Sequence, residues 1–355
     1  MKILISGICG FVGSVLAGFL RESIPGVEIL GMDNLMRPGS ETNRRVLADM
    51  GVRLVHGDLR CASDFESLPA VDWVIDAAAN PSVMAGVDGK SSSRQVIEHN
   101  LLGTVNMLEY CRRVTAGFIL LSTSRVYSIP VLASVPLVPA GIRFMPDSTA
   151  ALPMGFSAAG IREDFSTAAP VSLYGSTKLA SECLALEYGE AFKFPVRINR
   201  CGVMGGAGQF GTAEQGIFSY WLHAWKAGRP LRYIGFDGLG KQVRDAFHPL
   251  DLGRLVLAQI SDPGRKGPAI INAGGGLENS MSLAELSAWC SERFGPRGVQ
   301  SDAAPRPYDL PWVVMDNAAV AQMWQWQPQI KLPALLDSIA EHVLANPHWL
   351  SLSAA

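Results

Sequence analysis

The stretch Met1–Ser14, MKILISGICGFVGS, decides the fold. It begins with the short apolar run Lys2–Ser6, typical of a strand, and continues with three glycines at the spacing G-x-x-G-x-x-G, where a helical apolar pattern begins. A turn without Cβ atoms lets backbone N–H groups and a helix N-terminus approach a pyrophosphate. The stretch therefore predicts a strand, a tight turn and a helix that bind a dinucleotide through Gly7, Gly10, Phe11, Val12 and Gly13.

A carboxylate follows at the distance that such a turn requires. The apolar run Val27–Met32 predicts a second strand, and it ends in Asp33, about twenty residues beyond the turn. An Asp at this place accepts hydrogen bonds from adenosine ribose hydroxyls and repels a 2′-phosphate, which favours NAD over NADP. The nearby Arg37 weakens that preference slightly. The alternative is an ordinary β-α-β unit with a glycine turn.

Composition limits the classes of function. With 30 Lys and Arg against 32 Asp and Glu, the 355-residue chain has a net charge of −2 and no basic excess for nucleic acid. Its six cysteines are scattered without C-x-x-C spacing, which predicts reduced core thiols, no metal site and a cytoplasmic location. No apolar run is long enough for a membrane span, so we expect no membrane partner.

Strand and helix signals alternate through the first half of the chain, which predicts the α/β class and a Rossmann-type, doubly wound parallel sheet. Small residues after one of these strands, Ala77 and Ala78, would let the backbone pass close beside a dinucleotide. Two long helices are expected at Arg94–Arg113 and Leu173–Phe192. Further strands are expected at Val52–His56, Trp73–Ile75, Phe118–Leu121 and Val196–Asn199.

The pattern changes near residue 200, and we divide the chain there. Residues 1–200 are expected to form the NAD-binding domain, with a Pro-, Ala- and Ser-rich insertion at 128–170 that is either a partly ordered flap over the substrate or a mobile surface loop. Residues 201–355 are expected mainly to form a smaller C-terminal, substrate-binding lobe that does not extend the sheet. The alternative is that some of its strands or helices return to the Rossmann domain.

Two residues at the start of the expected helix Leu173–Phe192 can carry chemistry. Tyr174 and Lys178 are four apart, so both side chains lie on one helix face. A lysine ammonium one turn from a phenol stabilises the phenolate, which would lower the pKa of Tyr174 toward that of a general base. Thr123, just past the fifth strand, could hydrogen bond to the substrate oxygen. With the dinucleotide loop, this set predicts hydride transfer, whereas alone it would be an exposed helix pair.

Arg244 is a candidate for the substrate phosphates, because a guanidinium binds a pyrophosphate through a planar fork. The alternative is a surface ion pair with Asp245 or Asp251. The single histidines His223 and His248 lack a partner carboxylate in the sequence and receive no role.

Several features occur together in this chain: the glycine loop, Asp33, Asp58-Leu59, Asn100, Thr123 four residues before Tyr127, and Tyr174-x-x-x-Lys178. As a set they resemble the extended short-chain dehydrogenase/reductases, the family of NAD-dependent nucleotide-sugar epimerases and dehydratases, over nearly the whole chain. Within that family, the segments 33–43, 208–216 and 240–245 are most similar to the CDP-paratose 2-epimerase (CDP-tyvelose epimerase) subfamily.

The resemblance implies roles for individual residues. Tyr174 would be the base, Lys178 its electrostatic partner and a ligand of the nicotinamide ribose, and Thr123 the hydroxyl that relays a proton. The implied cofactor contacts beyond the glycine loop are Asp33, Asn34, Asp58, Leu59, Ala77, Ala78, Asn100, Tyr174, Lys178 and Arg200. The implied substrate contacts are Arg125, Cys201, Val203, Gln209 and Arg244.

The resemblance also implies an activity and an assembly. We expect an NAD-dependent epimerase of a nucleotide-diphosphate sugar, acting by transient hydride abstraction and return, and a homodimer. A 4,6-dehydratase or dehydrogenase is the first alternative. Dehydratases of this family typically carry an Asp-Glu pair after the catalytic Thr, where this chain has Ser124-Arg125, which argues against dehydration. A non-catalytic NAD-binding regulatory protein is the second alternative.

Overall fold

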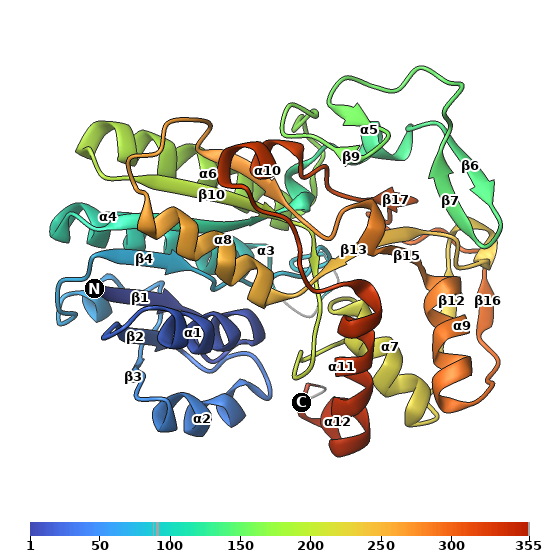
Figure 1. Cartoon of the computed structure of the whole chain (residues 1–355), viewed down its shortest axis with the longest axis horizontal. Helices are drawn as coiled ribbons and strands as arrows, with labels where there is room; N and C mark the ends of the chain where they lie inside the picture. The colour runs from blue at the N-terminus through green and yellow to red at the C-terminus, as the bar shows by residue number, and fades with distance from the viewer. Residues whose placement is uncertain (88, 90–91, 354–355) are drawn as a thin grey trace.

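The computed structural model of the protein describes residues 1–87, 89 and 92–353. At its centre lies a seven-stranded parallel sheet in the order β14-β10-β5-β4-β1-β2-β3 (Figure 1). The strand order reverses between β1 and β4, which confirms the doubly wound arrangement. The strands are β1 (Lys2–Ser6), β2 (Glu28–Asp33), β3 (Arg53–His56), β4 (Trp73–Asp76), β5 (Gly117–Thr123), β10 (Val196–Cys201) and β14 (Ile270–Ala273).

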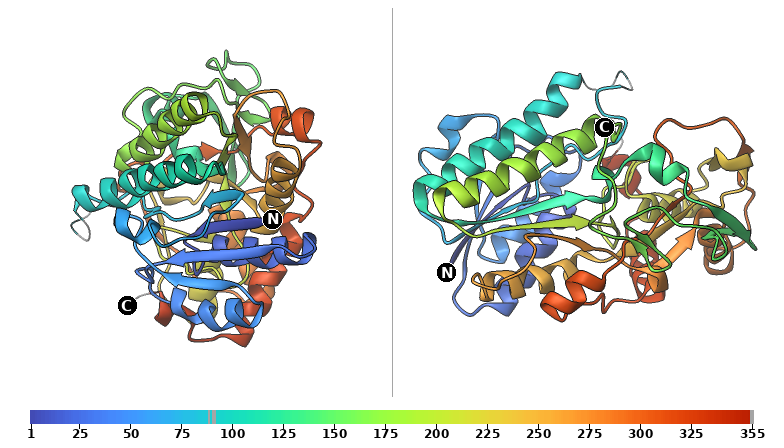
Figure 2. Two further views of the ribbon diagram at one scale, coloured as in Figure 1. Left: turned by 90° about the vertical axis from the view of Figure 1, so that its left-hand side faces the viewer. Right: turned by 90° about the horizontal axis from the view of Figure 1, so that it is seen from above.

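Helices cover both faces of the sheet, as Figure 2 shows from above. One layer holds α1 (Phe11–Ser23), α8 (Pro249–Ser261) and α10 (Ala318–Trp324). The other holds α4 (Gly103–Val114) and α6 (Ser172–Phe192), with α3 (Ser93–Ile97) and the π-helical turn η3 (Glu98–Leu102) leading into α4. The remaining helix of this domain is α2 (Asn43–Asp49), and short 3-10 turns are η1 (Ser40–Thr42), η2 (Ala62–Phe65) and η4 (Ser124–Val126).

The alternation of side chains along the strands explains these two layers. In β1, Ile3 and Ile5 bury against the layer of α1 and α8, whereas Leu4 between them buries against the layer of α4 and α6. All seven residues of β5 are buried. Strands that are apolar on both faces read as continuous apolar runs, which is why the parallel sheet was predictable.

The C-terminal lobe has a core of its own, formed around Phe218, Trp221, Leu286, Leu335 and Ile339. Its helices are α7 (Ile217–Lys226), α9 (Leu283–Phe294), α11 (Leu332–Ala345) and α12 (Trp349–Leu352), with 3-10 turns η5 (Phe236–Gly238) and η6 (Leu277–Asn279). Its strands are β11 (Val203–Met204), β12 (Arg232–Ile234), β13 (Val243–Phe247), β15 (Ser280–Ser282), β16 (Gln300–Asp302) and β17 (Trp312–Val313).

For residues 201–355 the structure shows the alternative, in which some elements return to the Rossmann domain, and the expectation that none of them extends the sheet is wrong. Strand β14 pairs in parallel with β10, from Ile198 opposite Ile270 to Cys201 opposite Ala273. Helix α8 packs on α1, and α10 packs on β14. The chain therefore returns to the Rossmann domain after building part of the lobe, because the apolar residues of these elements complete the core beneath the sheet.

The insertion 128–170 folds into ordered elements and is not the mobile loop that was one of its two interpretations. It contains α5 (Ile129–Ala133), the hairpin of β6 (Leu137–Ala140) and β7 (Arg143–Pro146), and the short pair β8 (Phe156–Ser157) and β9 (Gly160–Ile161). Its apolar side chains Leu132, Phe156 and Phe165 are buried in a cluster with Trp312 and Val314. This burial gives the segment a fixed place beside the lobe.

All six cysteines are free thiols, but Cys61 and Cys183 are exposed, so the prediction that all six lie in the core is wrong for these two. Among the described residues, no helix is both long and apolar enough to cross a membrane.

Candidate active site

A cavity of about 660 Å³ opens at the C-terminal ends of the parallel strands, where the lobe faces the Rossmann domain. From the Rossmann side it is lined by the glycine loop, Asp33, Thr123, Tyr174 and Lys178. From the lobe side it is lined by residues that include Gln242, Arg244, Met281, Leu286 and Arg306. Ligands of doubly wound folds bind at this edge of the sheet, so the cavity is the candidate active site.

The glycine loop has a backbone that only glycine fits. Gly7 has a φ of +62°, and a Cβ there would lie 2.9 Å from Cα of Ala78. A Cβ on Gly13 would lie 2.3 Å from the carbonyl oxygen of Gly7. Helix α1 starts after Gly10 with no side-chain cap and no acidic residue in its first turn. No side chain therefore neutralises the partial positive charge of the first N–H groups of α1, which face the cavity. This arrangement fits the pyrophosphate of a dinucleotide.

Asp33 is fixed at the end of β2 by two backbone donors. Its Oδ2 accepts a hydrogen bond from the N–H of Cys9 at 2.9 Å, and its Oδ1 accepts one from the N–H of Leu35 at 2.8 Å. Burial raises the pKa of Asp33, and these two hydrogen bonds oppose the rise. Arg37 donates to the carbonyl of Phe210 and, at 2.9 Å, to Oε1 of Gln215, so its guanidinium is engaged by the lobe.

A second carboxylate lies beyond β3. Asp58 accepts hydrogen bonds from Nε and Nη2 of Arg60, at 2.9 and 2.6 Å, and from Nδ2 of Asn34 at 3.1 Å. The hydrogen bonds with Arg60 hold the pKa of Asp58 below its usual range. His99 lies in the same cavity, and its Nε2 is buried without a hydrogen-bond partner among the described residues. No motif marks His99, so its place in the cavity was not predictable from the sequence.

Thr123, Tyr174 and Lys178 lie together at the cavity, as predicted. Helix α6 comes close to the end of β5 because Gly175 has no side chain: a Cβ there would lie 2.3 Å from the carbonyl oxygen of Arg125. All three catalytic candidates are buried, with Tyr174 7% and Lys178 2% exposed. The fold therefore shields the phenol and the ammonium from bulk water.

The sequence predicts a lowered pKa for Tyr174, and this prediction is wrong. Burial raises the pKa of Tyr174 to about 12 and outweighs the hydrogen bond with Thr123 and the positive charge of Arg125, which oppose the rise. Beneath Lys178 lies Asp76, whose Oδ1 and Oδ2 accept hydrogen bonds from the hydroxyls of Ser6 and Thr104. Burial raises the pKa of Asp76, and the charge of Lys178 opposes this.

Guanidinium groups gather on the lobe side of the tyrosine. Nη1 of Arg125 donates to the carbonyl of Tyr308 at 3.1 Å, and burial together with the charge of Arg244 lowers the pKa of Arg125 to about 10. Arg244 pairs with Asp309 at 3.0 Å, so the alternative pairing with Asp245 or Asp251 is wrong. Arg306 also lines the cavity and was missed from the sequence, because its place depends on the fold of the loop before β17.

Two predicted cofactor contacts do not line the cavity. Asn100 is buried beneath it, where its Oδ1 accepts from the N–H of Asn80 at 2.7 Å and its Nδ2 donates to Thr177. Arg200 forms a buried ion pair with Glu182 at 2.7 Å. These partners hold Asn100 and Arg200 away from the ligand space, so both roles are corrected to structural support. All other predicted site residues line the cavity.

The insertion 128–170 also fails one expectation, because none of its residues lines this cavity. It is therefore not a flap over the substrate in this structure. Within the described ranges, no group of three or more His, Cys, Asp or Glu side chains is placed to hold a metal ion.

Comparison with known proteins decides the family. The model of the NAD dependent epimerase/dehydratase family matches residues 3–274, from the first strand through β14. The chain belongs to this family. Membership in the NAD-dependent epimerase/dehydratase family confirms the predicted resemblance and the predicted cofactor, NAD.

Curated relatives within this family differ in reaction. CDP-paratose 2-epimerase of Salmonella typhi is 28% identical over 93% of this chain and 95% of its own length. UDP-glucose 4-epimerase of Corynebacterium glutamicum is 25% identical over 93% of this chain and 91% of its own. UDP-glucuronic acid decarboxylase 3 of Arabidopsis thaliana is 31% identical over 94% of this chain and 86% of its own. The family therefore sets the scaffold and leaves the reaction open.

Solved structures share the fold over almost the full length. UDP-glucuronic acid 4-epimerase from Bacillus cereus, solved with UDP-glucuronic acid and NAD, is 22% identical with a TM-score of 0.75 and covers 97% of this chain and 99% of its own. UDP-glucose 4-epimerase from Thermus thermophilus, solved with NAD, is 24% identical with a TM-score of 0.72 and the same coverage of both chains. These likenesses confirm the Rossmann-type fold.

Proposed function

We propose that this family member is a nucleotide-sugar epimerase that removes and returns a hydride, with a substrate preference like that of CDP-paratose 2-epimerase. One observation carries the proposal. The same cavity is lined by the glycine loop and Asp33, by Thr123, Tyr174 and Lys178, and by arginines of the lobe. The 28% identity to a CDP-paratose 2-epimerase over almost the whole chain supports the preferred substrate class.

The glycine loop, Asp33 and Lys178 would hold NAD, which when bound would accept a hydride from a sugar carbon and return it to the opposite face of the ketone. Tyr174 Oη would remove the proton of the sugar hydroxyl as the hydride leaves, and would give it back as the hydride returns. Thr123 Oγ1 would orient that hydroxyl by a hydrogen bond. Lys178, one helical turn from the tyrosine, would add its positive charge to the effects of Thr123 and Arg125, which oppose the rise in the pKa of Tyr174 that burial causes.

The lobe arginines would bind the diphosphate of the substrate. Arg125, Arg244 and Arg306 act on one another electrostatically, and the carboxylates that act on Arg244 are Asp309 and Asp245. This leaves an excess of positive charge on partly buried side chains that line the cavity, which suits a diphosphate dianion. We therefore propose Arg125, Arg244, Gln209, Val203 and Cys201 as substrate contacts.

The residues that follow Thr123 disfavour dehydration by a 4,6-dehydratase. Arg125 brings a guanidinium to the place where the dehydratases of this family typically carry an acid, and no carboxylate replaces it on η4. A dehydrogenase would use the same hydride transfer but release the ketone. A non-catalytic regulatory protein would not need Thr123, Tyr174 and Lys178 together at the cavity.

The purified protein should therefore be incubated with a panel of CDP-, UDP- and dTDP-sugars, and the products followed by NMR and mass spectrometry. We expect an epimer of unchanged mass from a CDP-sugar, without net release of NADH. A product lighter by one water would instead identify a dehydratase. Absence of turnover on the whole panel, with NAD bound, would support the regulatory alternative.

We also propose a cytoplasmic homodimer. Ile97 and Leu102 lie beside the paired helices α4 and α6 and are 44% and 40% exposed, so they offer apolar surface to a second copy. The six free thiols support a reducing compartment. Light scattering at micromolar concentration should give twice the chain mass, and a monomer would contradict the proposal.

A further inference from the structure

The hairpin β6–β7 of the insertion contacts the outer side of the cavity wall. On the lobe side, that wall is formed by β13, β15 and the first turn of α9. We call the lobe wall the set of cavity-lining residues Gln242, Arg244, Met281, Ser282, Leu283 and Leu286. Figure 1 shows the hairpin standing over β15 and α9.

The lobe wall continues directly from the phosphate site. Gln242 and Arg244 alternate along the chain and both reach the cavity, and Arg244 pairs in register with Met281 of β15. Gln242 donates its Nε2 to the carbonyl of Ile234 at 3.3 Å, while its Oε1 is buried without a partner among the described residues. An apolar surface with an open acceptor beside a diphosphate site suits a nucleobase.

The hairpin is fixed to this wall at several points. The N–H of Phe144 donates to the carbonyl of Lys241 at 3.0 Å, and the hydroxyl of Ser282 donates to the carbonyl of Ile142 at 2.8 Å. The ring of Phe144 meets the ring of Phe236 edge-on, with 6.0 Å between the ring centroids. The two hydrogen bonds reach a residue of the lobe wall or its neighbour in sequence, and the ring contact reaches η5.

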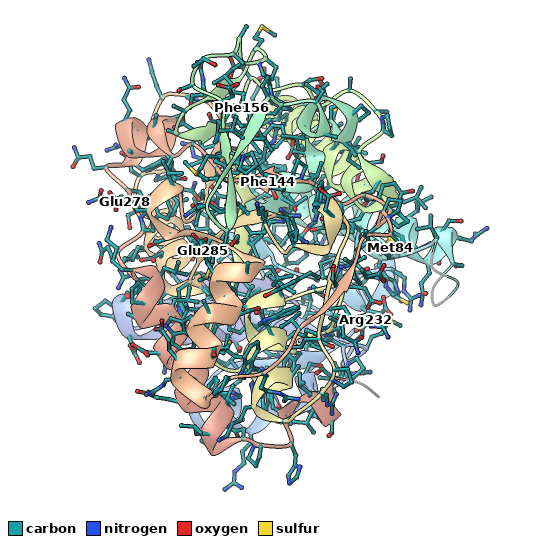
Figure 3. All side chains as sticks on the ribbon, turned by 90° about the vertical axis from the view of Figure 1, so that its right-hand side faces the viewer. Met84, Phe144, Phe156, Arg232, Glu278 and Glu285 are labelled. Carbon is teal, nitrogen blue, oxygen red and sulfur yellow. The ribbon has the colours of Figure 1, made fainter. Side chains whose placement is uncertain are left out.

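Arg143 provides the strongest link. Its Nη2 donates to the hydroxyl of Ser280 at 2.6 Å, and its Nη1 lies 3.6 Å from Oε1 of Glu285. The same Glu285 closes the N-terminus of α9, because its Oε2 accepts from the N–H of Ser282 at 2.6 Å in a capping box. Figure 3 labels Phe144 on the hairpin and, below it in that view, Glu285 on α9. Arg143 therefore holds the carboxylate that orients the first turn of α9.

We propose that Arg143 and Phe144 are positioning residues for the nucleotide half of the substrate. They contact no ligand themselves and act through Glu285, Ser280 and Lys241 on the lobe wall. The insertion thus contacts the lobe wall on the side away from the cavity. Through these contacts it fixes the shape of the surface that receives the nucleobase and ribose. This inference rests on the proposed function, since it assumes that the cavity takes a nucleotide sugar.

Binding of CDP and UDP to the NAD-loaded full-length protein, measured by calorimetry, tests the proposal without requiring turnover. Arg143→Met removes both the hydrogen bond to Ser280 and the ion pair with Glu285, whereas Arg143→Lys keeps the positive charge. Val138→Ala is the matched control, because Val138 lies in the same hairpin and is 41% exposed. We expect Arg143→Met to weaken binding of the preferred nucleotide about tenfold, Arg143→Lys less, and the control not at all.

Kinetics separate positioning from a general loss of structure. With a sugar nucleotide that turns over, Arg143→Met should raise KM by the same factor and leave kcat and bound NAD within about twofold of the wild type. If Arg143→Met does not fold, Ser280→Ala removes the same hydrogen bond from the other partner and should weaken binding in the same direction. Unchanged nucleotide affinity in the folded variants, or no binding of CDP or UDP to the wild type, would overturn the proposal. Failure of the proposed epimerase activity alone would leave the calorimetric result intact.

Discussion

The two sides of the cavity are built in different ways. On the Rossmann side, the functional residues follow short motifs on regular elements: the glycine loop between β1 and α1, Asp33 at the end of β2, and Tyr174 with Lys178 on one turn of α6. On the lobe side, the wall combines β13, β15, α9 and the loop before β17, which meet through long-range pairing. We infer that the first side carries the cofactor and the chemistry, and the second the recognition of the substrate.

The largest effect is expected from a change on the Rossmann side. Tyr174→Phe removes one oxygen from a buried ring, so the fold and NAD binding should survive. Turnover should fall by about 10²–10⁴, the usual contribution of a positioned acid or base. Steady-state kinetics and the NAD content of the purified variant measure this. A variant that keeps more than half of the activity would remove Tyr174 from the chemistry.

A change on the lobe side should act on the substrate alone. Arg244→Met removes a guanidinium from the phosphate site and leaves Asp309 unpaired. KM for the sugar nucleotide should rise about 10- to 100-fold, because a hydrogen bond to a charged group contributes roughly 1.5–3 kcal/mol. NAD content is the control and should not change. A loss of NAD together with the loss of substrate affinity would break the proposed division between the two sides.

Asp33→Ala tests the same division from the cofactor side. The variant loses the carboxylate that Cys9 and Leu35 hold in place, and with it the hydrogen bonds expected to the adenosine ribose. NAD should bind more weakly, by on the order of 1.5–3 kcal/mol for each lost bond, and the discrimination against NADP should diminish. Titration of apo-protein with both cofactors measures this. Wild-type protein that binds NADP more tightly than NAD would contradict the role of Asp33.

Arg125 lies where the two sides meet, and its effect on kcat should be the smallest. The pKa of Tyr174 is raised to about 12 by burial, so the phenolate fraction, and with it kcat, should increase as pH rises through the alkaline range. Arg125 carries its charge only below its own pKa of about 10, so Arg125→Met should lower kcat below that pH by less than about tenfold and leave the limb above it unmoved. Arg125→Lys is the control. An unchanged kcat below pH 10 in Arg125→Met would show that this charge does not act on Tyr174.

Local patterns made the Rossmann side predictable from the sequence. Glycine spacing, apolar runs and the four-residue interval between Tyr174 and Lys178 depend on neighbouring residues, and the structure places these groups together as expected. The pKa of Tyr174 was not predictable, because it depends on burial by distant elements. The cofactor roles predicted for Asn100 and Arg200 were wrong for the same reason. Their partners Asn80 and Glu182 come close to them only in the folded chain.

The lobe side was less predictable because its contacts join distant segments. Arg306 reaches the cavity from the loop before β17, and the insertion packs behind the wall instead of over the substrate. The return of β14 to the sheet could not be inferred from Ile270–Ala273 alone, since a short apolar run fits either domain. Such placements follow from pairing partners and not from local sequence.

The fate of the hydrogen at the inverted carbon tests the central claim most directly. The wild-type protein should be given its sugar nucleotide in deuterated water and the product analysed by NMR. If a hydride leaves and returns within one cavity, the inverted carbon keeps its original hydrogen and no NADH accumulates. Full incorporation of solvent deuterium at that carbon would mean inversion by deprotonation, and it would contradict the proposed mechanism.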